Sequence, residues 1–153
     1  MIELFERMVL QFVNEEGKKI RIVWVSSDYK YCSYVNIFDS TSMPQISSIS
    51  AIEELINSGE LIQTHDPFVY GSNESALSEK IKVERDRLWE IIDFLWMSDK
   101  TQIIMKSSRG KAIKEASEKF GESEKQVRRI ISRFLQRGMV KNSLLPEYEA
   151  RGG

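Results

Sequence analysis

The chain has few of the residues on which thiol, disulfide and metal chemistry depend. Cys32 is its only cysteine, so it cannot form an intrachain disulfide, and nothing in it points to an oxidising compartment. His65 is its only histidine, and one histidine with one cysteine cannot supply the ligand cluster of a zinc site. The two are a conceivable catalytic pair, but Cys32 lies in a strand-like run, where a packed thiol is more common. We expect no catalytic residue and no metal site.

Long apolar runs and glycine clusters are also absent from the sequence. No apolar run approaches the ~20 residues needed to span a bilayer. The N-terminus carries Glu3 and Glu6 and lacks the basic start and apolar run of a signal peptide. The eight glycines are scattered, so no glycine-rich loop is available to cradle a phosphate. We therefore expect a cytoplasmic protein with no membrane partner.

The sequence does contain enough apolar side chain for packed cores, and its charge is unevenly distributed. Its 153 residues are 41% hydrophobic and 10% aromatic, which favours one ordinary domain or two small ones over a disordered chain. Residues 99–153 hold 13 Lys and Arg against 7 Asp and Glu, a net charge of +6, while the first 98 residues have a net charge of −7. Such asymmetry indicates a polyanionic partner for the C-terminal third alone.

The segment Ser123–Gly138 carries the strongest functional signal. Its apolar residues recur at the i, i+3, i+4, i+7 spacing of an amphipathic helix; they are Val127, Ile130, Ile131 and Phe134, with Leu135 beside them. The opposite face is polar and consists of Lys125, Arg129, Ser132, Arg133 and Gln136, with Gln126 and Arg128 at its edges. Such guanidinium, amide, hydroxyl and ammonium groups pair with phosphates and with base edges in a major groove. A solvated helix face is the alternative interpretation.

The flanking sequence predicts a helix-turn-helix. Ser123 and Gln126 match a capping box at the start of the helix, and Gly121 can take the left-handed conformation that ends a preceding helix. That preceding helix spans residues 109–120, and a third, over residues 81–97, carries a wide apolar stripe. Two helices joined by a short glycine-containing turn are typical of this motif.

We predict that this region binds double-stranded DNA. The N-terminal half of the helix enters the major groove, where Lys125, Gln126 and Arg129 read base edges. The full predicted set of contact residues is Lys125, Gln126, Arg128, Arg129, Ser132, Arg133, Gln136, Arg137 and Lys141, with Arg109, Lys111 and Lys114 added by the preceding helix. For the last three, solvated charge is the alternative.

The N-terminal half is predicted to form a β-rich subdomain over residues 1–75. Strands are indicated over residues 8–13, 19–25, 31–38 and 61–62, and a helix over residues 50–58 is placed to cover the open face of the sheet. The predicted fold class is therefore α+β. A small antiparallel sheet with a helix is followed by a three-helix helix-turn-helix domain over residues 76–140 and by an extended linker over residues 141–153.

Four aromatic residues accompany the predicted strands: Trp24, Tyr29, Tyr31 and Tyr34. They could form a platform for nucleic acid, but aromatic residues in strands more often pack across the sheet. The acidic balance of this half favours packing. Whether the half contacts protein or DNA stays open.

Two stretches near the end of the chain resemble the junction found in TnsB-type transposases. Residues 133–138, RFLQRG, match the family's R-x-x-Q-R-G, and residues 142–148, NSLLPEY, match the N-A-L-[LI]-P-D-Y that follows it. Ser143 replaces the usual Ala, and Glu147 the usual Asp. Further back, GELI and THDPFV, within residues 59–69, resemble the family's G-R-L-V and T-D-D-P-Y-V.

The resemblance implies the N-terminal DNA-binding region of a transposase of the DDE superfamily, to which Mu-like transposases and retroviral integrases belong. That region recognises repeated sites in transposon ends during DNA transposition, recombination and integration. The implied partners are double-stranded DNA and other transposase subunits, and the implied location is the bacterial nucleoid. The family's catalytic domain uses an Asp-Asp-Glu set with Mg²⁺. No part of that domain is in this sequence, so we expect no enzymatic activity and no cofactor.

Two other functions fit parts of the sequence. The acidic half could make the chain a protein-docking module of a transposition complex. Alternatively, the helix-turn-helix could belong to a transcription regulator, which predicts a palindromic target and a stable dimer. The sequence has no apolar helix to spare for such a dimer.

Overall fold

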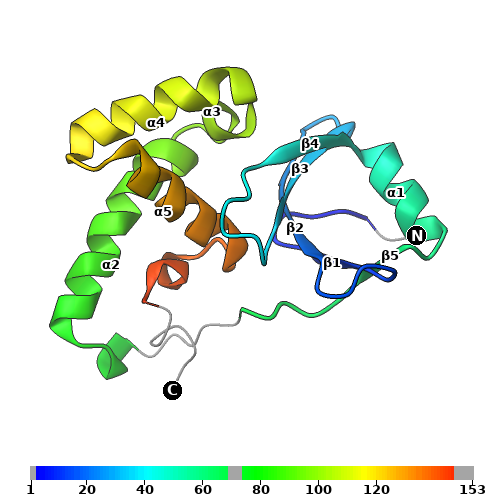
Figure 1. The fold of residues 1–153 in the computed structure, drawn as a ribbon, viewed down its shortest axis with the longest axis horizontal. Helices are drawn as coiled ribbons and strands as arrows, with labels where there is room; N and C mark the ends of the chain where they lie inside the picture. Colours follow the sequence, from blue (N-terminus) through cyan, green and yellow to red (C-terminus); the bar gives the residue numbers. More distant parts are fainter. Residues whose placement is uncertain (1–2, 69–73, 147–153) are drawn as a thin grey trace. The chain divides into compact units, whose positions relative to one another are not determined.

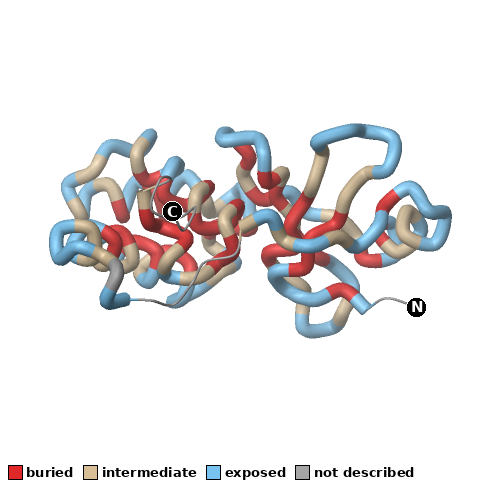
Figure 2. The backbone as a smooth tube through the Cα atoms, turned by 90° about the horizontal axis from the view of Figure 1, so that it is seen from below, coloured by how far each residue is buried: buried red, intermediate tan, exposed pale blue. Residues whose placement is uncertain are grey.

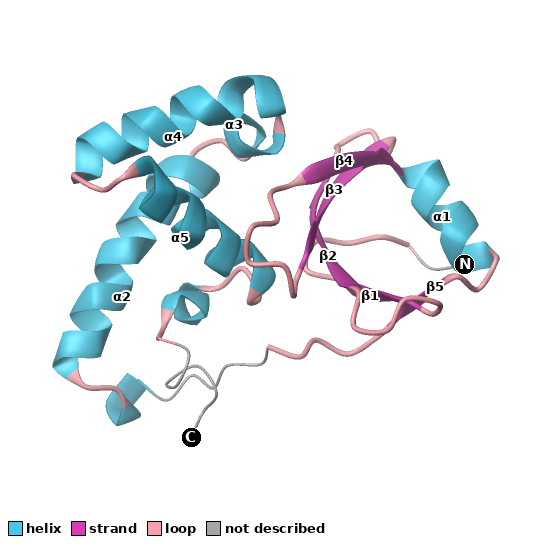
Figure 3. Cartoon of the chain, viewed as in Figure 1, coloured by secondary structure: helices cyan, strands magenta, loops and turns pink. Residues whose placement is uncertain are grey.

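The computed structural model describes residues 3–68 and 74–146, which fall into two compact units (Figure 1). The first unit is Met1–Pro67 and the second is Phe68–Gly153, whereas the sequence placed the division after residue 75. The first consists mainly of strands and the second of helices (Figure 3), which confirms the predicted α+β class. No helix of the described chain is long and apolar enough to cross a membrane.

The elements of the first unit, in chain order, are β1 (Val9–Phe12), β2 (Lys19–Val25), β3 (Tyr31–Asn36), β4 (Gln45–Ser48), α1 (Ile49–Asn57) and β5 (Leu61–Gln63). Those of the second unit are the short 3₁₀ helix η1 (Glu74–Ala76), α2 (Glu79–Ile92), the π-helical turn η2 (Asp93–Met97), α3 (Thr101–Ile104), α4 (Lys106–Phe120), α5 (Glu124–Gln136) and the 3₁₀ helix η3 (Lys141–Leu144).

The strands of the first unit form one antiparallel sheet in the order β4-β3-β2-β1-β5. β2 lies at its centre, as expected for the segment KIRIVWV with its alternating β-branched residues. The residues of β4, QISS, lie outside the strands that the sequence predicted, and only one of the four is apolar. They become a strand by pairing with β3, where Ile46 lies opposite Ser33. A cross-strand partner therefore decides a conformation that local propensity does not.

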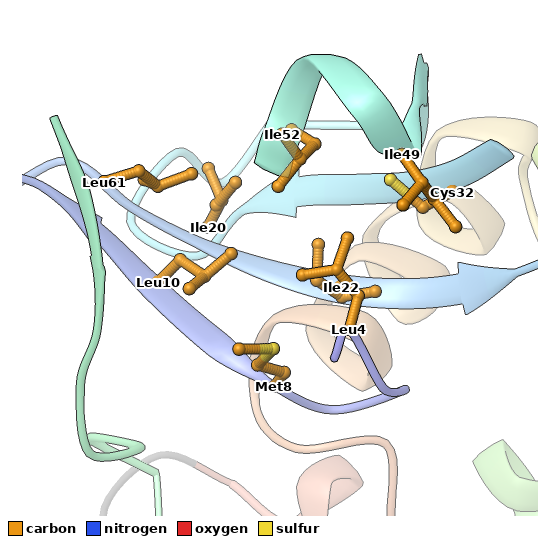
Figure 4. Close-up of a cluster of buried hydrophobic side chains, with 9 residues drawn as sticks. All are labelled: Leu4, Met8, Leu10, Ile20, Ile22, Cys32, Ile49, Ile52 and Leu61. Carbon is orange, nitrogen blue, oxygen red and sulfur yellow. The ribbon is translucent and has the colours of Figure 1, made fainter. Parts of the chain in front are cut away.

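The helix α1 covers one face of this sheet (Figure 4), as the sequence predicted. It begins at Ser48, whose hydroxyl oxygen accepts a hydrogen bond from the Ala51 N–H at 3.2 Å. The core between the helix and the strands consists of Leu4, Met8, Leu10, Ile20, Ile22, Cys32, Ile49, Ile52 and Leu61. Burial of these side chains provides the main hydrophobic stabilisation of the first unit.

The opposite face of the sheet buries a charged residue. Arg21 on β2 is 0% exposed, and its Nη1 and Nη2 donate to the two carboxylate oxygens of Asp66 at 2.7 and 2.9 Å. Nη1 also donates to the carbonyl oxygen of Arg7 at 3.0 Å. Because Asp66 follows β5, this bidentate ion pair binds the end of the first unit to its central strand.

The aromatic residues of the first unit have mostly structural surroundings. Tyr29 and Tyr34 pack against the core, and the Tyr29 hydroxyl accepts a hydrogen bond from the Leu4 N–H at 2.7 Å. Trp24 is half-buried, and Tyr31 is 51% exposed. Packing thus accounts for two of the four, as the acidic composition favoured.

In the second unit the predicted helix over residues 81–97 consists of α2 and the π-helical turn η2. A π turn leaves backbone carbonyls without their usual partners. The side-chain amide of Gln102, on α3, donates to the Leu95 carbonyl oxygen at 2.6 Å, and the Ser98 hydroxyl donates to the Phe94 carbonyl oxygen. The helix α3 has four residues, too few to show a helical period in the sequence.

The helices of the second unit share one buried apolar core (Figure 2). Phe134 of α5 is 1% exposed, and its ring lies 6.0 Å from that of Trp89 and 6.3 Å from that of Trp96, measured between centroids. The remaining core includes Leu88, Ile91, Ile92, Leu95, Ile103, Ile104, Ala112, Ile113, Ala116, Val127, Ile130, Ile131 and Leu135. The apolar stripe predicted for α5 is the stripe that the fold buries.

The prediction of an extended linker from residue 141 is wrong for its first residues. Lys141–Leu144 form the 3₁₀ helix η3, and Ser143, Leu144 and Leu145 are buried. The Ser143 hydroxyl donates to the Arg137 carbonyl oxygen at 3.0 Å and accepts from the Val140 N–H at 3.1 Å. The segment is fixed by these contacts and by contacts with α2, which local sequence does not show. Residues 147–153 of the predicted linker lie outside the described residues.

Candidate nucleic-acid interface

The turn between α4 and α5 fixes where the second helix of the pair begins. Gly121 ends α4 in the left-handed conformation with φ +69°, as predicted. The Ser123 hydroxyl oxygen then accepts from the Gln126 N–H at 3.0 Å and caps α5. Glu122 lies within the turn and pairs with Arg87 of α2 at 2.6 Å. The start of α5 is therefore held both by its own cap and by the neighbouring helix α2.

The N-terminal half of α5 presents its basic residues to solvent. Lys125, Arg128 and Arg129 are exposed, and Gln126 is half-buried. Among the residues that the structure describes, these three cations form no ion pair. Their charges are thus available to an anionic ligand without displacing any carboxylate of the described residues. An exposed helix end with unpaired guanidinium and ammonium groups suits phosphates and guanine edges.

The C-terminal half of the polar face of α5 differs. Ser132 is 2% and Gln136 is 8% exposed, while Arg133 and Arg137 are half-buried. The spacing of the residues placed Ser132 and Gln136 on the polar face of the helix, but the structure buries both side chains. We leave Ser132 and Gln136 out of the candidate interface, because neither side chain is available at the surface.

The helix α4 contributes two of the three basic residues that the sequence proposed. Lys111 and Lys114 are exposed and form no ion pair within the described part of the chain. Arg109 has a different role, since its Nε donates to the Ile103 carbonyl oxygen at 2.8 Å and its Nη2 donates to that of Ile104 at 3.3 Å. It caps the carbonyls at the end of α3.

The electrostatics of Arg109 agree with this structural role. Burial lowers the pKa of Arg109, and the nearby charge of Arg128 lowers it further. A guanidinium that is half-buried and committed to backbone carbonyls is a poor phosphate ligand.

Lys141 belongs to a cluster of charged side chains beside α2. Its Nζ lies 3.0 Å from Asp86 Oδ1, and the two side chains are 44% and 49% exposed. Asp86 also accepts from the Nε of Arg85 at 3.0 Å, so one carboxylate serves two cations. The hydrogen bond from Lys141 is the largest influence that lowers the pKa of Asp86 below its usual value, and Arg85 adds to it.

Arg85 is the centre of this cluster, and sequence reasoning missed it. It is 3% exposed, and its Nη1 donates to Asn142 Oδ1 at 2.8 Å. Its Nη2 donates to Glu74 Oε2 at 3.1 Å, and the pair lowers the pKa of Glu74 and raises that of Arg85. One arginine thus joins the residues before α2 to those after α5. The one sequence feature that pointed to this cluster was Asn142, the partner of Arg85, because it is the first residue of the NSLLPEY motif.

Cys32 and His65, the conceivable catalytic pair of the sequence, differ in their exposure. Cys32 is fully buried, and burial raises its pKa to about 11, so the thiol stays protonated near neutral pH. His65 is exposed. Within residues 3–68 and 74–146, no three His, Cys, Asp or Glu side chains are grouped so that they could hold a metal ion.

Known family models match both units. Residues 8–67 match the TnsB N-terminal SH3-like domain, and residues 85–148 match the TnsB second domain. The chain belongs to the TnsB transposase family. The two matched domains make it a transposase DNA-binding region with a helix-turn-helix, which confirms the resemblance drawn from its motifs. None of the curated proteins matches the sequence significantly.

The residues that resemble TnsB motifs have structural tasks in this fold. Asp66, in the THDPFV string, holds Arg21, and Asn142, in the NSLLPEY string, is held by Arg85. Ser143, where the TnsB pattern has Ala, adds two hydrogen bonds of its own. In each domain, the residues that resemble a TnsB motif therefore bind the C-terminal segment of that domain to its core.

Proposed function

We propose that the chain recognises repeated sites in transposon ends, as the DNA-binding region of a TnsB-type transposase. The observation that carries the proposal is the first half of α5. There Lys125, Arg128 and Arg129 are exposed on the second helix of a helix-turn-helix and have no ion pair among the described residues. Strand transfer with Mg²⁺ belongs, in this proposal, to the family's catalytic domain, which neither matched model represents.

The proposed docking places the N-terminal half of α5 in the major groove. Lys125, Gln126 and Arg129 reach base edges, since guanidinium, ammonium and amide groups match the donors and acceptors displayed there. Arg128 contacts a base or a phosphate, and Lys111 and Lys114 of α4 contact the phosphate backbone. Phosphate contacts fix orientation, whereas the base contacts carry the sequence preference.

The flanks of α5 complete the proposed contact. Arg133 and Arg137 are half-buried and are placed beside the backbone rather than at base edges, and Lys141 adds a further backbone contact. The charge of the second unit supports this assignment, because residues 68–153 hold 17 Lys and Arg against 13 Asp and Glu. The first unit is acidic, and we propose no backbone contact for it.

Fluorescence-anisotropy titration at two salt concentrations tests the proposal. The chain is titrated with the end repeats of its own element and with scrambled duplex of equal length. We expect a preference for the repeats of about 10³-fold or more, the lower range for specific binders. If about six phosphates are neutralised, log K should fall with log salt at a slope near −5.

Two results would contradict the proposed docking. A salt slope shallower than about −2 is too small for the phosphate contacts named above. Equal binding to repeats and scrambled duplex would leave only a basic surface, and would favour a protein-docking role for the acidic first unit. Titration of other transposase subunits against the chain without DNA would then test that role.

A further inference from the structure

Lys141 differs from the exposed cations at the start of α5 because it already has an ion-pair partner. Lys125, Arg128 and Arg129 form no ion pair among the described residues, whereas Lys141 Nζ lies 3.0 Å from Asp86 Oδ1. A phosphate that binds Lys141 must therefore replace a carboxylate. Both side chains of the pair are about half exposed, so the phosphate can approach without any change in the fold.

The backbone that carries Lys141 is fixed on both sides. Asn142 is bound by the buried Arg85, and Ser143 is bound to the Arg137 carbonyl and to the Val140 N–H. Lysine has a flexible four-carbon stem with a compact charge at its tip. The tip of Lys141 can thus move between ligands while its Cα stays in place.

Asp86 has a second cationic partner besides Lys141. Its Oδ1 accepts from Arg85 Nε at 3.0 Å, and Arg85 Nη2 lies 3.0 Å from the same oxygen. When Lys141 turns away, the carboxylate keeps the guanidinium as its counter-charge. Arg85 is shared with Glu74, but Asp86 is about half exposed. The exchange therefore leaves no buried charge without a partner, which is the condition that makes the loss of an ion pair expensive elsewhere.

We propose that Asp86 competes with DNA phosphate for Lys141 and thereby sets the affinity of this contact. The ion pair holds the Lys141 side chain in the free protein and is exchanged for a phosphate in the complex. This inference rests on the proposed function, since it takes the backbone contact of Lys141 from it. It adds a residue, Asp86, whose removal should strengthen binding rather than weaken it.

The test is a double-mutant cycle on the full chain, read by anisotropy titration with end-repeat duplex at low salt. The four proteins are the wild type, Asp86→Asn, Lys141→Ala and the double variant. Removal of a half-exposed ion-pair competitor should tighten binding about two- to fivefold in Asp86→Asn. In the Lys141→Ala background the same substitution should give no gain, because no lysine remains to be released.

The matched control is Glu79→Gln. Glu79 lies on the same helix, carries the same charge and pairs with a lysine, Lys82, at 3.4 Å, but Lys82 is no proposed DNA contact. This variant should change affinity far less than Asp86→Asn. Equal gains from the two would show a general charge effect and overturn the proposal.

Two further outcomes would overturn it. An unchanged or weaker affinity in Asp86→Asn would mean that Asp86 positions Lys141 for DNA instead of competing with it. A gain that persists in the Lys141→Ala background would mean that Asp86 acts without Lys141. Thermal denaturation checks the fold of each variant, and Asp86→Ser gives the same reading if Asp86→Asn is unstable.

Failure of the exchange is distinguishable from failure of the proposed function. Phosphate contacts carry no sequence information. The cycle can therefore be repeated on scrambled duplex, where the same two- to fivefold gain is expected at about the same salt. If the chain shows no preference for the repeats but the double-mutant cycle gives the expected gain, then only the proposal of end recognition is wrong.

Discussion

Residues 1–67 hold 5 Lys and Arg against 10 Asp and Glu, whereas residues 68–153 hold 17 against 13. In the first unit Arg21 is fully buried and paired with Asp66. In the second, Arg85 and Arg109 are likewise committed to the fold, and the cations at the start of α5 are left exposed without ion pairs in the described chain. The comparison shows that the fold itself uses part of the basic charge, so the cations that are exposed without an ion pair are fewer than the count of Lys and Arg suggests.

The largest effect should come from the buried ion pair of the first unit. Asp66→Ala leaves Arg21 buried without its carboxylate, and such a loss costs about 3 kcal/mol of stability. Urea denaturation measures the loss, and the labelling rate of the Cys32 thiol reports whether the first unit is the part that opens. Glu16→Ala removes an exposed carboxylate from the same unit and should leave stability almost unchanged. A loss below about 1 kcal/mol in Asp66→Ala would place the pair among ordinary surface ion pairs.

An arginine that the fold leaves unpaired should matter for DNA instead. Arg129→Ala should weaken binding to the end repeats by about 1–3 kcal/mol and blur the preference at one base position. Lys18→Ala is the control, because Lys18 is 39% exposed but paired with Glu15, and it lies in the first unit, for which no backbone contact is proposed. Titrations against repeats with single base changes give both quantities. Equal losses for Lys18→Ala and Arg129→Ala, or an equal loss on every sequence, would contradict the distinction between paired and unpaired cations.

A smaller effect is expected where this chain departs from the TnsB pattern. Ser143→Ala restores the usual residue but removes the hydrogen bonds to Arg137 and Val140, at a cost of about 1 kcal/mol. Thermal denaturation measures the change, with Ser107→Ala, an exposed position on α4, as control. Unchanged stability in Ser143→Ala would show that both groups find other partners.

The smallest effect concerns acid. Arg85 lowers the pKa of Glu74, and Lys141 and Arg85 lower that of Asp86. A depressed folded-state pKa means that the stabilisation is present at neutral pH and is lost as the pH falls below about 4. Glu74→Gln removes one titrating group, so its melting temperature should fall less than that of the wild type between about pH 5 and 3. Parallel decreases in the two proteins would show that Glu74 does not contribute.

Periodicity was sufficient to predict the elements whose own residues determine their structure. β2 was predicted with the observed ends, and α5 to within one residue at its start and two at its end, because the order of their apolar and polar residues has a period of two and of 3.6 residues, respectively. β4 and η3 were missed, since each depends on partners distant in sequence: β3 for the first, and Arg85 through Asn142 for the second.

The same limit applies to the candidate site. On α5, Lys125, Arg128 and Arg129 are exposed as the helical spacing requires. Ser132 and Gln136, on the same predicted polar face, are buried. Nothing local distinguishes the three exposed cations from Arg109, whose guanidinium is used by the end of α3. Arg21 shows the converse, because alternation places it on the face opposite the main core, yet a carboxylate 45 residues away allows it to be buried. Charge pairs between residues far apart in the chain could not be predicted from a single sequence.

The pair between Arg21 and Asp66 also has a mechanical consequence. The chain leaves the first unit just after β5, an edge strand with only β1 as its neighbour, and an edge strand pulled from one end unzips one hydrogen bond at a time. Asp66 lies between β5 and the end of the unit, and it accepts two hydrogen bonds from Arg21 on the central strand. A force that pulls on the chain after Asp66 must therefore break the ion pair with Arg21 before it can separate β5 from β1. The force thus acts on the central strand β2 before it acts on the edge strand β5.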